Sequence, residues 1–192
     1  GGQMHGLVIL DKEDKVIRPA ILWNDGRTGE ETDYLNQVIG KDKLSEYTAN
    51  IAFAGFTAPK VLWVKNKEPE NFARIEKIML PKDYLAYKLS GVHCTDVSDA
   101  SGMLLLDVEH KCWSREMLNL CGVREAQLPP LRVGDGIALG RCGAYSVTEG
   151  VAVFLSRDMP RVALYRDGAF TLVRDRFATD VLNTCQTLED RT

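Results

Sequence analysis

Gln3, Met4 and His5 form a short group of side chains that suits a polyhydroxylated ligand. A sugar has hydroxyl groups that need hydrogen-bond donors and acceptors, and C–H faces that need apolar cover. Gln3 and His5 supply the polar contacts, and the thioether of Met4 supplies the apolar one. Each such hydrogen bond contributes about 0.5–1.5 kcal/mol net, while an unpaired buried partner costs more, so this group favours specificity over affinity. A purely structural role ahead of a strand is the alternative.

A second polar group follows at Trp23, Asn24, Asp25 and Arg27, where an expected strand ends. Ligand-binding residues often occupy such positions, because the strand holds them while the loop exposes them. The Trp23 ring can stack on a sugar face, and the other three side chains can bond its hydroxyls. The alternative is a polar turn in which Arg27 pairs with a nearby carboxylate.

Three further segments have residue types that occur in metal or nucleotide sites. Residues 95–102 are rich in Asp and Ser but lack the longer ligand series and distal Glu of a calcium loop, so self-bonded turns are favoured. Asp107, Glu109 and His110 lack a zinc-binding spacing. Residues 134–140 have the wrong glycine spacing for a nucleotide loop. We therefore expect no metal-binding, cofactor-binding or catalytic residue in this chain.

Five segments in a fixed order resemble the xylulokinases of the FGGY carbohydrate kinase family, which share the actin and hexokinase type of fold. These segments are residues 2–6, 21–28, 55–60, 80–85 and 95–102. The resemblance covers residues 2–131 and has faded by residue 140. It implies an α/β, ribonuclease H-like N-terminal kinase domain with a small mixed sheet and flanking helices. It also implies that Met4 and His5 contact a ketose, that Trp23–Arg27 line or support its pocket, and that residues 95–102 shape its wall.

The resemblance implies a parent enzyme that uses ATP and Mg²⁺ to phosphorylate D-xylulose to D-xylulose 5-phosphate. In that family the catalytic base is an Asp in a Gly-Gly-x-Asp-Asn type segment, and the phosphates are held by an Asp-x-Gly-Thr type hairpin. The sequence contains neither motif. We therefore expect a fragment that is inactive alone. The alternatives are a fragment of a kinase for ribulose or a related polyol, and a non-catalytic sugar-binding or interaction module.

Composition narrows the possible partners. The chain has 192 residues, 45% apolar content and a net charge of −3, so no overall field attracts nucleic acid or an anionic membrane. Its longest clean apolar run, residues 103–106, is too short to span a bilayer, and no signal peptide is visible. The five cysteines lack a Cys-x-x-Cys pair, so reduced thiols and a cytoplasmic location are expected.

Periodicity and capping residues predict the elements that would position these groups. Strands are expected at 6–10, 16–22 and 77–80, and helices at 28–39, 41–48, 57–68, 69–75, 82–89 and 115–120. Thr28, Thr57 and Ser114 are the expected N-caps, and Gly40 and Gly122 the expected stops. If the sheet begins partway through, its open edge favours self-association.

The composition changes near residue 131. Residues 1–131 contain 11 Lys and 5 Arg, whereas residues 132–192 contain 8 Arg and no Lys. We therefore expect a partial kinase N-terminal domain over 1–131 and a tail of different origin over 132–192. A reading-frame slip, a fusion or an arginine-preferring β-rich appendage would each explain this change. Strands are expected in the tail at 151–155, 162–165 and 170–173.

Overall fold

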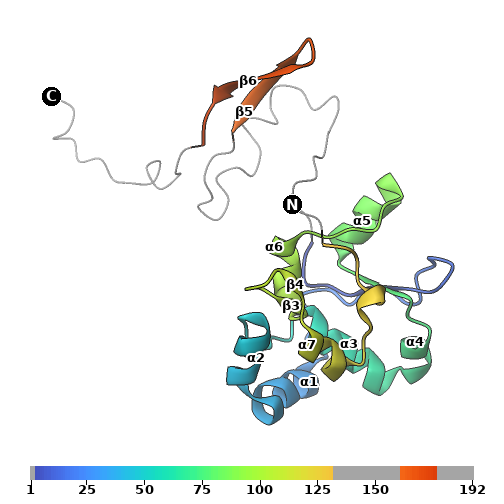
Figure 1. Ribbon diagram of the computed structural model, residues 1–192. Coiled ribbons are helices and arrows are strands. Elements are labelled where there is room, and N and C mark those ends of the chain that lie inside the picture. Colours follow the sequence, from blue (N-terminus) through green and yellow to red (C-terminus); the bar gives the residue numbers. More distant parts are fainter. Residues whose placement is uncertain (1–2, 132–160, 177–192) are drawn as a thin grey trace, which may run out of the picture. The chain divides into compact units, whose positions relative to one another are not determined.

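The computed structural model describes residues 3–131 and 161–176, and the chain divides into two compact units, Gly1–Asp135 and Gly136–Thr192 (Figure 1). In the first unit, β1 (Val8–Leu10) pairs antiparallel with β2 (Lys77–Met79). On the side away from β2, Leu7 pairs with Ile21 and Leu10 pairs with Val16 in isolated antiparallel bridges. The predicted hairpin therefore exists, but Pro19 lies between the two bridges and the second strand is irregular, as expected of a proline there.

Helices and a second small strand pair complete this unit. The strand pair is formed by β3 (Leu106–Asp107) and β4 (Cys112–Trp113). The helical elements are α1 (Gly29–Asp33), the π-helix η1 (Tyr34–Gly40), α2 (Lys41–Thr48), α3 (Thr57–Lys67), α4 (Pro69–Ala73), α5 (Pro81–Ser90), α6 (Val97–Ala100), the 3-10 turn η2 (Ser101–Met103), α7 (Arg115–Cys121) and the 3-10 turn η3 (Glu125–Gln127). The single helix predicted over 28–39 is thus an α-helix that continues as a π-helix, and Gly40 with φ of 100° ends it.

The core lies around α3, which packs against α1 and α7 (Figure 1). Ala58, Val61 and Val64 share one face of α3 and are fully buried. They belong to one apolar cluster that includes β-strand residues and the segment 103–106. This cluster makes α3 the central helix of the unit, so α3 anchors the loop of residues 54–56 that precedes it.

Of the predicted caps, Thr57 is wrong, and Thr28 is right in position but makes no capping hydrogen bond. Phe56, not Thr57, occupies the N-cap of α3, and the Thr57 hydroxyl donates to the His5 carbonyl oxygen at 3.1 Å. Thr28 stands at the N-cap of α1, but its hydroxyl donates to the Ala54 carbonyl oxygen at 3.0 Å instead of capping the helix. Both threonines serve long-range contacts, because each hydroxyl has a buried carbonyl within reach.

Other local predictions are confirmed. Ser114 caps α7 by accepting a hydrogen bond from the Met117 amide, and Gly122 with φ of 72° ends that helix. The spacing of Leu85 and Leu89 correctly indicated α5. These two leucines are nevertheless 61% and 83% exposed, so this face of α5 is not part of the core.

The second unit contains an antiparallel hairpin of β5 (Val162–Arg166) and β6 (Ala169–Arg174), with Gly168 in its turn at φ of 82°. Two strands predicted in the tail are therefore confirmed, and the third, 151–155, lies outside the described residues. The assignment of 1–131 to a kinase domain and of 132–192 to a separate tail stays a prediction. Within the described ranges, no helix has the length and apolarity needed to cross a membrane.

Asp14 ties the first turn to β2 and α5. Its carboxylate accepts hydrogen bonds from Lys77 Nζ at 2.5 Å and from the Tyr87 hydroxyl at 2.9 Å. The His93 ring stacks on the Tyr87 ring with centroids 3.8 Å apart, and its Nε2 lies 3.5 Å from Oδ2 of Asp14. The Lys77 hydrogen bond, opposed by partial burial and aided by Tyr87, lowers the pKa of Asp14 to about 2.

We expect Asp14→Asn to lower the free energy of unfolding by about 1 kcal/mol at pH 7. Asparagine tolerates the left-handed backbone at this position, φ of 58°, so the change removes charge without new strain. The pKa of Asp14 in the folded state lies below its ordinary value of 3.8. The Asp14 carboxylate therefore stabilises the folded state fully above about pH 5, and this stabilisation is lost as the pH falls toward about 2. Urea unfolding across this range measures it. If the free energies of unfolding of wild type and variant differed by the same amount at low pH, the stabilising role of the Asp14 carboxylate would be contradicted.

Candidate functional site

The hairpin register brings the two predicted sugar-binding groups to one end of the sheet. Leu7 and Ile21 exchange backbone hydrogen bonds of 2.8 Å and 3.1 Å. Residues 3–5 and 23–27 both lie beyond this bridge, at the same end of the hairpin. The strand pairing does not continue to them, because His5 has a φ of 64° in a bend and Trp23 lies in a turn.

His5 is fixed by three contacts from two other segments. Its Nδ1 lies 3.0 Å from the Gly102 carbonyl oxygen, and its ring stacks on Phe56 with centroids 4.9 Å apart. Its backbone carbonyl accepts the Thr57 hydroxyl. Because a carbonyl oxygen only accepts, Nδ1 carries the proton and Nε2 keeps a free lone pair. This side chain can therefore accept a hydrogen bond from a ligand hydroxyl.

Gln3 and Met4 are held through the backbone. The Gln3 carbonyl accepts from the Lys82 amide at 3.1 Å, and the Met4 carbonyl accepts from the Gly6 amide at 2.8 Å. A Cβ at Gly6 would lie 2.6 Å from Cγ of Pro81, so glycine alone lets this segment pack on the start of α5. The Gln3 side chain is exposed and that of Met4 is half-buried. Both are available to a ligand.

Trp23 and Asn24 are exposed, and Trp23 is 56% exposed. The backbone beneath Trp23 meets the loop before α3, where a Cβ on Gly55 would lie 3.0 Å from the Trp23 carbonyl oxygen. The next residue in that loop is Phe56, which stacks on His5. One short loop, residues 54–56, therefore contacts both halves of the predicted site.

Asp25 and Arg27 form a two-pronged ion pair. Arg27 Nε donates to Asp25 Oδ1 at 2.9 Å, and Nη2 donates to Oδ2 at 2.7 Å. This pairing lowers the pKa of Asp25 and raises that of Arg27. The guanidinium also lies 4.8 Å from the centroid of the Trp63 ring. The polar turn that was the alternative for this segment is thus present, and it orients the rim on which Trp23 and Asn24 stand.

Lys82 connects three of the segments that carried the resemblance. Its ammonium lies 2.6 Å from Asp83, 2.7 Å from Asp96 and 3.4 Å from Asp99. Burial acts against the charged form, but the hydrogen bonds that the ammonium donates to Asp83 and Asp96 raise the pKa of Lys82 above its ordinary value. Since the Lys82 amide also binds Gln3, this cluster fixes the start of α5 and the loop before α6 beside residues 3–5.

The described residues do not fit a magnesium–nucleotide site. Across residues 3–131 and 161–176, no three His, Cys, Asp or Glu side chains meet in a way that could hold a metal ion. The carboxylates of Asp83, Asp96 and Asp99 surround an ammonium group, which already balances part of their charge. No step of a phosphoryl transfer is therefore assigned to these residues.

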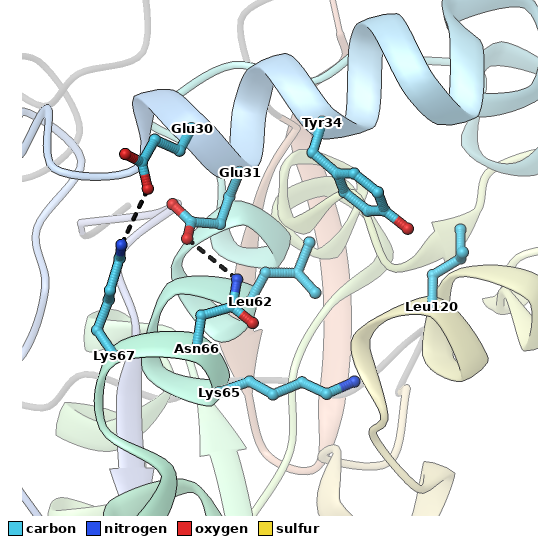
Figure 2. Close-up of a pocket in the computed structure, with 8 residues that line it drawn as sticks. All are labelled: Glu30, Glu31, Tyr34, Leu62, Lys65, Asn66, Lys67 and Leu120. Carbon is cyan, nitrogen blue, oxygen red and sulfur yellow. Dashed lines mark hydrogen bonds and ion pairs between the residues drawn. The ribbon is translucent and has the colours of Figure 1, made fainter.

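Two shallow hollows lie away from the predicted sugar residues. The first, about 360 Å³, is shown in Figure 2 between α1, α3 and α7. Lys67 bonds Glu30 at 2.9 Å and Asn66 bonds Glu31 at 3.2 Å on one of its sides. The second, about 510 Å³, lies beside β4 and α7. Neither hollow is lined by residues 3–5 or 23–27.

Sequence reasoning singled out segments 55–60 and 95–102 without identifying which residues contact His5. These are Phe56, Thr57 and Gly102. The glycine carries the clearest signal: a Cβ there would lie 2.2 Å from the His5 ring. A glycine amid Asp and Ser residues reads locally as a turn, and only the long-range contact explains it.

Comparisons with known proteins identify the family of this chain. The sequence model for the N-terminal domain of the FGGY family of carbohydrate kinases matches residues 1–173. The xylulose kinase of Lactococcus lactis is 49% identical over 130 residues, which are 68% of this chain and 26% of that protein. The xylulose kinase of Escherichia coli is 46% identical over 136 residues, 71% of this chain and 28% of that protein.

The fold is also found among solved structures. The xyloylose kinase from Brucella ovis superposes with a TM-score of 0.67 at 46% identity, over 71% of this chain and 28% of that one. The resemblance to xylulokinases and the α/β fold class are therefore confirmed, and the chain spans about a quarter of the length of the relatives it matches. This chain belongs to the FGGY family of carbohydrate kinases and corresponds to part of that family's N-terminal domain.

Proposed function

We propose that this chain supplies the sugar-binding wall of a xylulose kinase, which transfers a phosphoryl group from ATP to the terminal hydroxyl of D-xylulose. The relatives named xylulose kinases, 46% and 49% identical to this chain, support the substrate. The loop of residues 54–56 supports the site, because it contacts both His5 and Trp23, which belong to the two groups that the sequence indicated separately. FGGY carbohydrate kinases generally use ATP and Mg²⁺, which supply the phosphoryl group and balance its charge.

In this proposal each predicted residue has its own task. Nε2 of His5 accepts a hydrogen bond from a ketose hydroxyl, and Met4 covers a C–H face. Trp23 stacks against the opposite part of the sugar, while Gln3 and Asn24 bond hydroxyls at the rim. Asp25 and Arg27 already satisfy each other, so they support the rim and contact the sugar less directly.

We expect the chain to bind D-xylulose without nucleotide, with a Kd on the order of 1 mM, because one open wall leaves much of a small sugar in water. His5→Ala and Met4→Ala should each raise this Kd about threefold to tenfold, the value of one lost contact. Isothermal titration calorimetry measures both. Lys12→Ala is the matched control, because Lys12 lies in an exposed turn of the same hairpin.

The choice of sugar is tested in the same titration. D-Ribulose differs from D-xylulose in the configuration of one carbon and should bind more weakly. Equal binding of both sugars would favour a kinase for ribulose or a related polyol. Wild-type binding that is absent, or unchanged in both His5→Ala and Met4→Ala, would contradict the proposed wall.

We expect no phosphoryl transfer by this chain alone. The sequence contains neither the Gly-Gly-x-Asp-Asn type segment nor the Asp-x-Gly-Thr type hairpin, and the described residues hold no metal cluster. A coupled assay of ADP release with ATP, Mg²⁺ and D-xylulose measures this. ADP formation that depends on D-xylulose and exceeds background would overturn the expectation.

We expect Gly102→Ala to displace the His5 ring, because the new Cβ would lie 2.2 Å from Cε1 and 2.4 Å from Nδ1. The ring can rotate away, so the fold persists while the free energy of unfolding falls by about 1–3 kcal/mol. Binding of D-xylulose should weaken as in His5→Ala. Gly29→Ala is the control, since a Cβ at that position would have no neighbour within 4 Å. Equal effects of the two substitutions would argue against the His5 contact.

A further inference from the structure

Lys60 is a completely buried lysine in the first turn of α3, beside its apolar face. Its neighbours Ala58, Val61 and Val64 are fully buried as well. The Lys60 ammonium turns back to the loop before the helix. It lies 3.0 Å from the Ala54 carbonyl oxygen, 3.1 Å from that of Phe56, and in contact with that of Gly55. One side chain thus binds three consecutive carbonyls.

The chemistry of the group matches this arrangement. An ammonium has three N–H donors, and here three carbonyl oxygens accept them, so the buried charge is fully hydrogen-bonded. Within the described residues Lys60 has no carboxylate partner at ion-pair distance; Asp25 acts on it only from farther away. Burial lowers the pKa of Lys60 to about 8, with the Asp25 charge opposing this shift, so the side chain is charged at neutral pH.

Packing alone does not explain a lysine here. Methionine has a similar length and would fill the same space without the free-energy penalty of burying a charge. The distinguishing property of lysine is its three donors. They restrain the backbone of residues 54–56. Among the described residues, the one other side-chain hydrogen bond to this backbone comes from the Thr28 hydroxyl, which donates to the Ala54 carbonyl oxygen at 3.0 Å.

The restrained loop joins the two halves of the candidate site. Gly55 lies under the Trp23 carbonyl, where a Cβ would come within 3.0 Å. Phe56 stacks on the His5 ring with centroids 4.9 Å apart. A shift of this loop would therefore move the His5 and Trp23 sides relative to each other.

We infer that Lys60 is a positioning residue, whose ammonium holds the carbonyls of residues 54–56 and thereby sets the placement of His5 and Trp23 for sugar binding. The part of this inference that concerns the sugar rests on the proposed function. The part that concerns the loop is a property of the chain itself, and the two can be tested separately.

Lys60→Met is the central variant, and Lys67→Met is its matched control, because Lys67 is exposed on the same helix. The ring protons of His5 report the loop by NMR, since the stacked Phe56 ring shifts their resonances. Phe56→Leu supplies the reference for a lost stack. We expect the His5 resonances of Lys60→Met to move toward those of Phe56→Leu, and those of Lys67→Met to stay at wild-type values.

The titration with D-xylulose is then repeated on the same proteins. We expect the Kd to rise about fivefold in Lys60→Met, because the sugar must then order the loop itself, and to stay unchanged in Lys67→Met. A folded Lys60→Met with wild-type His5 resonances and wild-type affinity would overturn the inference. Shifted His5 resonances without sugar binding by the wild type would leave Lys60 as the loop anchor and refute the proposed function.

A measurement on the wild type covers the case in which Lys60→Met does not fold. At pH 6.5, below the pKa of about 8, a fully hydrogen-bonded ammonium exchanges its protons slowly with water. We therefore expect a slowly exchanging lysine ammonium resonance in a ¹⁵N-lysine spectrum whose couplings to the ¹³C carbonyls of residues 54–56 distinguish it from the carboxylate-bound ammonium of Lys82. A rapidly exchanging Lys60 ammonium without these couplings would overturn the inference.

Discussion

The antiparallel register of the first hairpin is the constraint on which the rest of the site depends. Leu7 pairs with Ile21, and this pairing sets which residues meet at the open end of the sheet. Both faces of residues 7–10 are buried, with Leu7 and Ile9 in one apolar cluster and Val8 and Leu10 in another, so a slip of one residue would exchange these two sets. The two clusters therefore hold the register, and the register sets where residues 3–5 and 23–27 leave the paired segment.

Two lysines, the half-buried Lys82 and the fully buried Lys60, complete what the register begins, and they do so in different ways. Lys82 is surrounded by the carboxylates of Asp83, Asp96 and Asp99, so it binds side chains from separate segments. Lys60 binds backbone carbonyls and has no carboxylate within ion-pair distance among the described residues. The first joins the segments, and the second shapes a loop. Each buried charge is tolerated because its donors are satisfied.

Local signals in the sequence predicted most elements of the first unit, but not the contacts between them. Ser114 and Gly122 marked the ends of α7 because caps act within a few residues. Thr57 looked equally like a cap, yet its hydroxyl binds His5, 52 positions away. Two of the predicted sugar residues, His5 and Trp23, contact the same loop, although nothing local to Gly102 indicated its contact with the His5 ring. Such contacts depend on tertiary packing, which a single sequence does not encode in any short window.

The geometry also separates the residues of one motif by task. Arg27 directs two N–H groups at Asp25 and stacks over Trp63, so little of its hydrogen-bonding capacity remains for a ligand. Nε2 of His5 and the exposed ring of Trp23 retain theirs. Under the proposed function, the resemblance over residues 21–28 would combine residues for ligand contact with residues that support the rim. A substitution at Arg27 should act through the position of Trp23, whereas one at His5 removes an acceptor directly, and this difference follows from which atoms are already paired.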